Sequence, residues 1–595
     1  MTSFPQDATT PQDPSAPWPF TGRAAETELV RRGGVVVTGP AGRGKTRLVS
    51  EALHGTEHVR AIGTPECRGI PFAAFAHLLP EPVTLHGAVR LLSGVRLLFV
   101  DDAHLLDDAS AALIHQLAAH GRTRLVVVAA DDAPAPGAVS RLWTGELLPR
   151  LALAPLRREE SAELLAAALG HGVDPLTADR LHRLCGGDLR LLRELVRAVV
   201  FAPVDGTEER AWRGPVPVTA AVREHAARVL RPGRTAERAV LDALAFAEPL
   251  PLSLTPPADT DALDLTALAE LEAEGLVTVD AHGAARLAHP LHGPVLRAAA
   301  GRLRARRPAR APDRCGPALA AEAEALRRAV ARDDVRELSA PVGEWLAAEG
   351  APLPAGYAAL RARFARLGGR LREAAAWARE GLRTRDDPEC RGELALAEAQ
   401  SGLPPTGHLT GAAAVWTAAA RGDLDGAVRA AAPYDAVRLG TPDPVPPAGR
   451  LTGVFAAHAD ALVRRDGPAL DEAAERLRRR GFLLFAAEAH AQAVGAHRDP
   501  AAARASRSRA AVLARRCQGA RTPALTAVIL GELTARQRQI VSLAAAGLSN
   551  RQIAERLTLS VRTVGNHLHA AYTRLGTGDR DALPRLVEPP TARSA

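Results

Sequence analysis

An eight-residue glycine-rich loop, residues 39–46, narrows the possible folds of this chain more than any other segment. Its spacing is GxxxxGK[ST], in which backbone N–H groups surround phosphate oxygens, the lysine reaches the outer phosphates and the hydroxyl binds Mg²⁺. A valine-rich run at 34–38 precedes the loop, and a helical pattern at 46–53 follows it. Strand, loop and helix in this order predict an α/β domain with a phosphate site. The residues expected to line that site are Gly39, Pro40, Ala41, Gly42, Arg43, Gly44, Lys45 and Thr46.

The basic residues of the chain support this interpretation. Lys45 is the only lysine among 75 basic residues, and all the others are arginines. Arginine is a broad planar fork that fits poorly inside a tight phosphate loop, whereas lysine is a compact point charge. A chain that uses arginine elsewhere therefore has lysine at the one position where phosphate chemistry requires it.

The composition argues against several classes of protein. A hydrophobic content of 47% supports packed cores rather than broad disorder. The five cysteines lie far apart without a CxxC pair, which argues against a zinc site or a disulfide framework and indicates a reducing cytoplasm. No apolar run approaches about 18 uncharged residues, and the N-terminus lacks a signal-peptide pattern. We therefore expect a cytoplasmic protein with no membrane partner, whose net charge of +8 permits binding to nucleic acid.

Two further apolar runs, 97–100 and 125–128, resemble the valine-rich run before the loop and predict buried parallel strands. Asp101 and Asp102 follow the first of them directly. In a nucleotide site Thr46 would bind Mg²⁺ through its hydroxyl and Asp101 would bind it through a water molecule, while Asp102 would polarise the attacking water if hydrolysis occurs. Paired aspartates at a strand end also cap the following helix in many proteins, and the sequence leaves that alternative open.

The N-terminal segments resemble the STAND class of AAA-related regulatory ATPases. The resemblance rests on residues 20–23 (Phe-Thr-Gly-Arg) with Glu26, on the glycine-rich loop, and on residues 101–107, which include His104 and Asp107. It implies a P-loop NTPase domain that binds ATP or ADP with Mg²⁺, and it places Arg23 near the adenine.

This sequence departs from the class at three positions. Ala24 replaces an acid, residues 129–132 (Ala-Ala-Asp-Asp) replace an arginine after the strand, and Leu189 replaces the proline of a Gly-x-Pro motif. These departures leave hydrolysis open, so the resemblance implies regulatory ATP binding with at most slow ATPase activity. Residues 288–291 match the His-Pro element of the class, in which His289 either contacts the ligand or serves in packing or a loop turn.

A Pro- and Gly-containing break at 203–218 is expected before the middle of the chain, which is predominantly helical. Residues 219–302 end in hairpin-like segments at 275–279 and 285–287, which predict a winged-helix-like module. Farther along, helix-pair units at 357–383 and 415–432 favour a tetratricopeptide-like region, with an irregular helical bundle as the alternative.

The C-terminal segment predicts a helix-turn-helix. Ser549 and Gln552 form a capping box that begins a helix at 549–557, and Ser560 caps a longer helix at 561–575 after a three-residue turn. Thr534 and Gln537 form a similar box for a preceding helix, which Gly547 ends. The residues expected to form the core between these helices are Ile553, Leu557, Val561, Val564, Leu568 and Leu575.

The amino-acid sequence of this segment closely resembles those of LuxR-type DNA-binding domains, which are four-helix modules. The resemblance rests on 548–554 (Leu-Ser-Asn-Arg-Gln-Ile-Ala), 562–564 and 566–568, with Gln537 and Gly565 as departures. Because Gly565 offers no side chain to the groove, base readout would depend more on Asn566 and His569. The residues expected to contact DNA are Ser549, Asn550, Arg551, Gln552, Ser560, Arg562, Thr563, Asn566, His567 and His569.

The fold class expected is a multidomain, mainly α protein with an N-terminal α/β P-loop domain. Both ends together resemble large ATP-binding LuxR-type transcriptional regulators. The resemblance implies promoter DNA, RNA polymerase, a second copy of the chain and an unknown inducer as partners. The alternative is a signalling scaffold or a phosphotransferase without a DNA role.

The expected domain organisation has six parts. These are a disordered tail at 1–19, an ATPase domain at 20–202, a winged-helix-like module at 203–302, a helical repeat-like region at 303–520, the helix-turn-helix domain at 531–583 and a tail at 584–595.

Overall fold

The computed structural model divides the chain into two units, residues 1–246 with 250–306, and residues 247–249 with 307–595. The expected tail at 584–595, and all of the tail at 1–19 except its last two residues, lie outside the described residues. The structure describes residues 18–575 except 81–82, 232, 249, 252–263, 280–282, 301–311, 337, 339–340, 384, 406, 408, 441–450, 532, 534 and 546.

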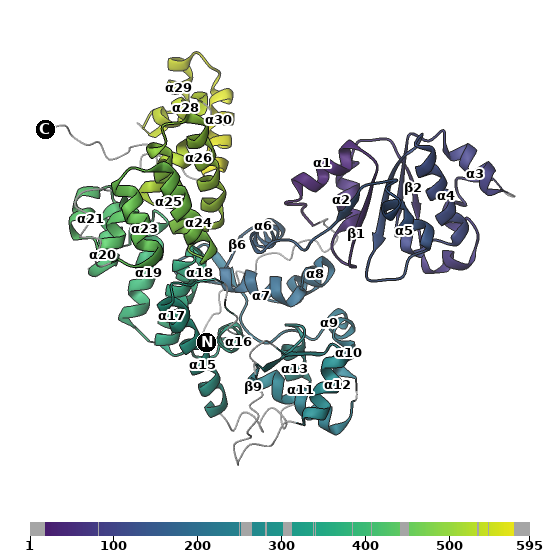
Figure 1. The fold of residues 1–595 in the computed structure, drawn as a ribbon, viewed down its shortest axis with the longest axis horizontal. Helices are drawn as coiled ribbons and strands as arrows, with labels where there is room; N and C mark the ends of the chain where they lie inside the picture. Colours follow the sequence, from purple (N-terminus) through teal and green to yellow (C-terminus); the bar gives the residue numbers. More distant parts are fainter. Residues whose placement is uncertain are drawn as a thin grey trace, which may run out of the picture. The chain divides into compact units, whose positions relative to one another are not determined.

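A parallel sheet of five strands forms the N-terminal part of the first unit (Figure 1). Its order is β2-β3-β4-β1-β5, so β4 lies between the strand before the glycine-rich loop and the strand before the paired aspartates. The three predicted strands are confirmed as β1, β3 and β4, whereas β2 and β5 had no clear sequence signal. The strands are β1 Val35–Gly39, β2 Val59–Ile62, β3 Leu97–Asp101, β4 Arg124–Ala130 and β5 Arg150–Ala152.

Helices cover both faces of the sheet because side chains alternate along each strand. Val35 and Val37 pack with α1 and α2, whereas Val36 and Val127 pack with α3, α4 and α5 on the other face. Because both faces of these strands are buried, successive residues must all be apolar. This is why the valine-rich segments could be predicted as strands. The helices are α1 Ala24–Arg32, α2 Lys45–Ala52, α3 Leu85–Leu92, α4 Asp108–His120 and α5 Gly137–Thr144, with 3₁₀ turns η1 Pro65–Gly69, η2 Ala73–Phe75 and η3 Ala103–Leu105.

A second core in this unit extends from Leu156 to Leu296. It joins α6–α8 to the winged-helix-like segment, where β10 and β11 form the predicted antiparallel hairpin. The stretch 203–218, expected as a break, instead contains β8 and the buried Trp212, on whose ring Arg180 lies 3.7 Å from the centroid. The elements are α6 Arg158–Leu169, β6 Gly172–Val173, α7 Pro175–Cys185, α8 Leu189–Ala198, β7 Ala202–Pro203, β8 Glu209–Ala211, α9 Ala220–His225, α10 Ala227–Leu230, α11 Thr235–Ala247, β9 Leu250–Pro251, α12 Leu265–Ala273, β10 Val277–Val279, β11 Ala284–Leu287 and α13 His292–Ala299.

The second unit is helical throughout its described residues. The helix pairs α17–α18 and α20–α21 fall on the two predicted units at 357–383 and 415–432. The helices are α15 Pro312–Ala331, α16 Pro341–Glu349, α17 Ala355–Leu367, α18 Leu371–Leu382, α19 Pro388–Gln400, α20 Gly411–Ala420, α21 Leu424–Ala430, α22 Pro433–Leu439, α23 Gly453–Val463, α24 Gly467–Arg479, α25 Leu483–Ala496, α26 Pro500–Arg516, α27 Pro523–Gly531, α28 Ala535–Ala545, α29 Asn550–Leu557 and α30 Val561–Leu575.

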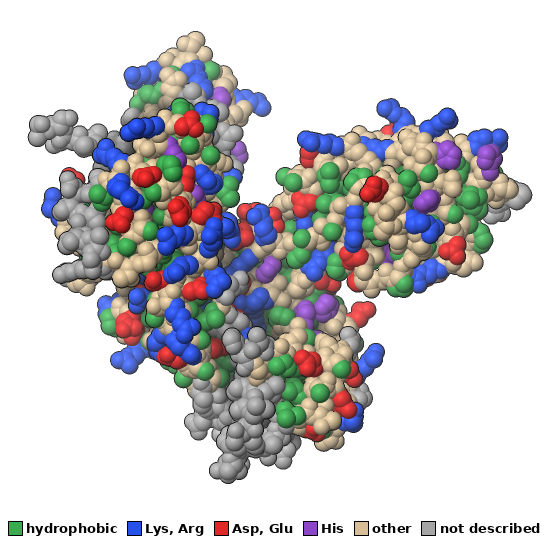
Figure 2. All heavy atoms as spheres, in the orientation of Figure 1, with side chains coloured by type: hydrophobic (Ala, Val, Ile, Leu, Met, Phe, Trp, Pro, Cys, Tyr) green, Lys and Arg blue, Asp and Glu red, His purple; other side chains and the backbone are tan. Residues whose placement is uncertain are grey.

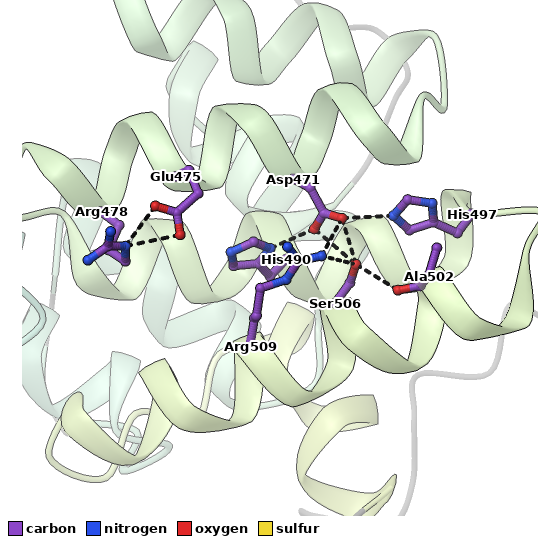
Figure 3. A network of polar contacts seen from close by, with 8 residues as sticks. All are labelled: Asp471, Glu475, Arg478, His490, His497, Ala502, Ser506 and Arg509. Atoms are coloured by element: carbon purple, nitrogen blue, oxygen red, sulfur yellow. Dashed lines mark hydrogen bonds and ion pairs between the residues drawn. The ribbon is translucent and has the colours of Figure 1, made fainter.

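Polar side chains connect these helices where alanine-rich surfaces offer little apolar volume. Asp471 on α24 accepts hydrogen bonds from Ser506 and Arg509 on α26 and contacts His490 on α25 at 2.6 Å (Figure 3). His497, just after α25, contacts the same carboxylate at 2.9 Å. One carboxylate therefore holds three helices in register.

Among the described residues, no helix is both long enough and apolar enough to cross a membrane.

Candidate nucleotide site and nucleic-acid interface

The glycine-rich loop lies at the carboxyl end of β1, between β4 and β5. The strand order reverses direction at this point, where open parallel sheets form their ligand crevice. Gly39, Gly42 and Gly44 have φ values of 147°, 77° and 84°, which side chains other than glycine rarely adopt. Gly44 also precedes the first residue of α2, so the helix N-terminus faces the loop. The sequence spacing therefore produces the backbone shape that surrounds a phosphate.

The lysine and the acid of the site occupy the positions that the motif requires. Lys45 is buried, and its ammonium group donates to the carbonyls of Gly39 and Pro40 at 2.7 and 2.8 Å. Thr46 donates its hydroxyl proton to Asp101 Oδ1 at 2.9 Å. Strand β3 thus brings Asp101 to Thr46 across 55 residues of sequence. A hydroxyl beside a carboxylate is the oxygen donor set that Mg²⁺ prefers.

The second aspartate differs from the first. Asp102 has φ 48° and a side chain that is 43% exposed, and its Oδ1 lies 4.0 Å from His104 Nδ1. His104 Nδ1 accepts the backbone N–H of Ala130, and burial lowers the pKa of this imidazole. Capping of the next helix is performed by Asp107, which accepts the N–H of Ser110 at 2.8 Å. Asp107 is therefore the residue that caps α4, and the paired aspartates lie at the carboxyl end of β3.

Two arginines of the predicted site bind backbone carbonyls. Arg43 donates to Gly186 O at 2.9 Å, and Arg23 donates to Ala154 O at 2.7 Å beside the end of β5. Leu189 donates its N–H to Gly42 O, so the start of α8 contacts the loop directly. A Cβ on Gly42 would lie 2.2 Å from the Asp188 carboxylate, which shows how closely this segment approaches. These contacts form a rim around the phosphate loop.

The residues of the loop fit a nucleotide phosphate with Mg²⁺. The glycine backbone forms a cradle, Lys45 supplies a buried positive charge, and Thr46 with Asp101 supplies hard oxygen ligands. The individual nucleotide roles of the predicted residues remain predictions.

Two charged residues of this site were missed by the sequence analysis. Arg60 on β2 donates to Asp101 Oδ2 at 2.7 Å, and Asp132 after β4 accepts the Ala41 N–H at 3.2 Å. Arg60 gave no signal because its short strand was not recognised. Asp132 could have been found, because it follows a predicted strand whose carboxyl end meets the same sheet edge.

His289 forms a turn in this structure. Its Nδ1 accepts the backbone N–H of Leu291 at 3.1 Å, and its ring lies 5.3 Å from that of His225 and 5.5 Å from that of His292. The turn alternative for His289 is therefore supported by a hydrogen bond.

The C-terminal helices begin and end where the capping residues predict. Gln552 donates its backbone N–H to the Ser549 hydroxyl, and its side chain accepts the Ser549 N–H at 2.8 Å. Thr558 ends α29 with φ 54°, and Ser560 accepts the Thr563 N–H at 3.0 Å to begin α30. The predicted helix–turn–helix is confirmed, whereas the box at Thr534 includes a residue outside the described part of the chain.

The core between these helices differs from the prediction at one position. Ile553, Val564 and Leu568 are buried as expected, and Leu557 is partly buried. The prediction that Val561 is a core residue is wrong. This residue is 51% exposed at the first position of α30, where the chain enters from the turn. The Leu575 side chain is not among those described. Residues from α28 complete the core: Ile540, Val541 and Ala544.

Most predicted DNA contacts lie at the surface of α29 and α30, and Figure 2 shows arginine side chains at the surface over this module. Asn550, Thr563 and His567 are half-buried. The exposed members of the predicted set are Ser549, Arg551, Gln552, Ser560, Arg562, Asn566 and His569. A helix with exposed polar residues in its first half can place them against base edges in a major groove.

The model for the LuxR family of bacterial regulatory proteins matches residues 531–587. Within this match, the described helices α28, α29 and α30 form the LuxR-type helix-turn-helix domain. Two proteins named as putative HTH-type transcriptional regulators, from Mycobacterium bovis and Mycobacterium tuberculosis, are each 47% identical to the chain over 53 residues. The match spans 9% of this chain and 6% of each relative's length.

Two solved structures are similar to the chain at low sequence identity. A STAND protein with a tetratricopeptide repeat sensor, from Pyrococcus horikoshii, is 14% identical over 95% of this chain and 79% of its own, with a TM-score of 0.25. A RuvB variant of Thermotoga maritima is 17% identical over 44% of this chain and 90% of its own, with a TM-score of 0.24. Scores this low establish no common arrangement, so the phosphate-loop assignment rests on the geometry of this chain.

Proposed function

We propose that this chain is a transcriptional regulator that binds ATP at the glycine-rich loop and promoter DNA through the LuxR-type domain. The proposal rests on one combination: a phosphate loop with Lys45, Thr46 and Asp101 in place, and a capped helix pair with exposed Asn566 and His569, on one chain. In this proposal the protein is cytoplasmic and activates transcription as a homo-oligomer that contacts RNA polymerase. An inducer of unknown chemistry acts through the helical region.

The nucleotide site is proposed to use each group in a specific way. Lys45 binds the outer phosphates, the loop N–H groups orient them, and Thr46 with Asp101 holds the cation. Bound Mg²⁺–ATP supplies concentrated charge that can shift a conformational equilibrium. Asp102 orients water if the nucleotide is hydrolysed. The rim formed by Arg43 and Leu189 would connect the loop to the adjoining helices.

DNA binding is tested with purified full-length chain and promoter fragments recovered by genome-wide mapping. We expect Asn566→Ala to reduce discrimination between the recovered sequence and random DNA by about tenfold, because one base contact is worth about 1–3 kcal/mol. Ser542→Ala, which truncates an exposed side chain on α28, is the matched control and leaves discrimination unchanged. Equal losses on specific and random DNA would contradict base readout by Asn566.

Nucleotide control is tested with Lys45→Ala. We expect this variant to lose ATP binding, measured by equilibrium titration, and to lose ATP-dependent promoter activation. Normal activation by Lys45→Ala would refute the switch. Two other outcomes identify the alternatives: activity that survives deletion of 531–595 indicates a signalling scaffold, and rapid ATP-dependent phosphorylation of a small molecule indicates a phosphotransferase.

A further inference from the structure

Two charged side chains outside the phosphate motif contact the groups that the motif provides for a nucleotide. One is an acid on the phosphate loop, and the other is a cation on the proposed metal ligand. Asp132 follows the end of β4, whereas Arg60 lies on β2 opposite Phe99 and reaches Asp101 at the end of β3 with its side chain. The signs of their charges match those of the ligand that the site is proposed to take.

Asp132 contacts the phosphate loop. Its Oδ2 accepts the backbone N–H of Ala41 at 3.2 Å, which is the type of bond that a phosphate oxygen would form with this loop. Burial lowers the pKa of Lys45, and Asp132 is the largest of the charges that oppose this shift. Asp132 is therefore close to both the loop and the ammonium group that would bind the outer phosphates.

Arg60 contacts the acid that would hold Mg²⁺. Its guanidinium donates to Asp101 Oδ2 at 2.7 Å, while Thr46 donates to the other oxygen of the same carboxylate at 2.9 Å. The Arg60 guanidinium also lies over the Phe99 ring at 5.1 Å from the centroid. The guanidinium therefore occupies a position beside Asp101 Oδ2 that a hydrated cation held by this carboxylate would also use.

We propose that Asp132 and Arg60 are built-in competitors of Mg²⁺–ATP: the Asp132 carboxylate takes the place of an outer phosphate, and the Arg60 guanidinium takes the place of the cation. This inference rests on the proposed nucleotide site. Binding of Mg²⁺–ATP must break both contacts, which moves the segment after β4 and frees the β2 edge. The competition lowers the affinity for ATP and couples nucleotide loading to a structural change.

The neighbouring acid provides a matched control. Asp131 carries the same charge one residue earlier, but its carboxylate pairs with Arg150 at 3.6 Å on β5. Arg90, an exposed arginine on α3, is the matched control for Arg60. Variants at these positions remove a charge from the same domain without touching the Ala41 or Asp101 contacts.

The first experiment measures ATP, ADP and adenosine affinities of the full chain by equilibrium titration. We expect Asp132→Asn to bind ATP about tenfold more tightly, with a smaller gain for ADP and none for adenosine, because a charge-assisted hydrogen bond no longer competes with phosphate. Asp131→Asn changes ATP affinity much less. Asp132→Ala is the second variant if Asp132→Asn fails to fold. Unchanged or weaker ATP binding in the folded Asp132 variant overturns the proposal.

The second experiment titrates Mg²⁺ at fixed ATP. We expect Arg60→Gln to reach half-maximal ATP binding at several-fold lower Mg²⁺ concentration than wild type or Arg90→Gln. An unchanged Mg²⁺ requirement overturns the role of Arg60. Lys45→Ala separates the two proposals: wild-type ATP binding by Lys45→Ala refutes the nucleotide site itself, whereas lost binding there with no gain in Asp132→Asn refutes only the competition.

Discussion

His458 should make the helical region sensitive to mild acid. Its side chain is completely buried on α23, where Nδ1 contacts the Tyr434 hydroxyl at 3.0 Å and Nε2 contacts Gln492 Oε1 at 2.7 Å. Burial lowers the pKa of this imidazole from 6.5 to about 4, and the nearby Arg438 acts in the same direction. The folded chain therefore keeps His458 neutral at pH values at which the unfolded chain protonates it.

The sign and size of the effect follow from proton linkage. Above pH 6.5 the imidazole is neutral in both states and contributes no pH dependence. Between pH 6.5 and pH 4 the unfolded state binds the proton more strongly, so stability is lost as the pH falls. Between pH 7.5 and pH 5.0 the expected loss is about 2 kcal/mol.

Hydrogen–deuterium exchange of the full chain can measure this loss locally. Opening free energies of amides in α23 and α25, corrected for intrinsic exchange, are compared at pH 7.5 and pH 5.0. We expect the wild type to lose about 2 kcal/mol more than His458→Gln, whose side chain does not titrate. Since His490 on α25 also titrates, only the difference between the two proteins reports on His458. Equal losses in both proteins would refute the assignment.

Four further variants test other parts of the structure. Ser549→Ala removes the capping box of α29 and should cost about 1 kcal/mol of stability in the LuxR-type domain, measured by thermal unfolding. Arg438→Met leaves Glu488 buried without its 2.7 Å partner and should destabilise the helical region by about 3–5 kcal/mol in urea unfolding. Asp471→Asn should weaken protection of α26 amides from exchange, and unchanged protection would show that its hydrogen bonds add nothing. Gly42→Ala should disrupt the phosphate loop, because its φ is 77° and a Cβ would meet Asp188; wild-type ATP affinity in this variant would contradict the loop geometry.

The sequence predicted those parts of the fold that depend on neighbouring residues. Capping boxes act within four residues, so Ser549 and Ser560 located the ends of α29 and α30 closely. Valine-rich runs predicted three of the five strands because both faces of those strands are buried. Strand β2 was not predicted, because its exposed residues interrupt the apolar pattern, as expected for an edge strand.

The burial of other residues depends on contacts with distant parts of the chain and could not be predicted from the neighbouring sequence. Val561 has the helical spacing of a core residue, yet it lies at the first turn of α30 and remains exposed. The segment 203–218 looks like a linker, but Trp212 is buried in a core shared with α6–α8. In both cases the packing partners, and not the spacing, decide burial.

The sequence by itself determined the phosphate loop, because backbone wrap, lysine and hydroxyl are all encoded within the eight residues 39–46. It also determined the ends of the helices in the helix-turn-helix, because their caps are local. Only the tertiary structure decided which charges meet at the loop. Strand order brings Asp101 to Thr46, Asp132 to Ala41 and Arg60 to Asp101, because β3 lies between β2 and β4, and β4 lies beside β1. Parallel pairing across the sheet sets these distances, and no local pattern records them.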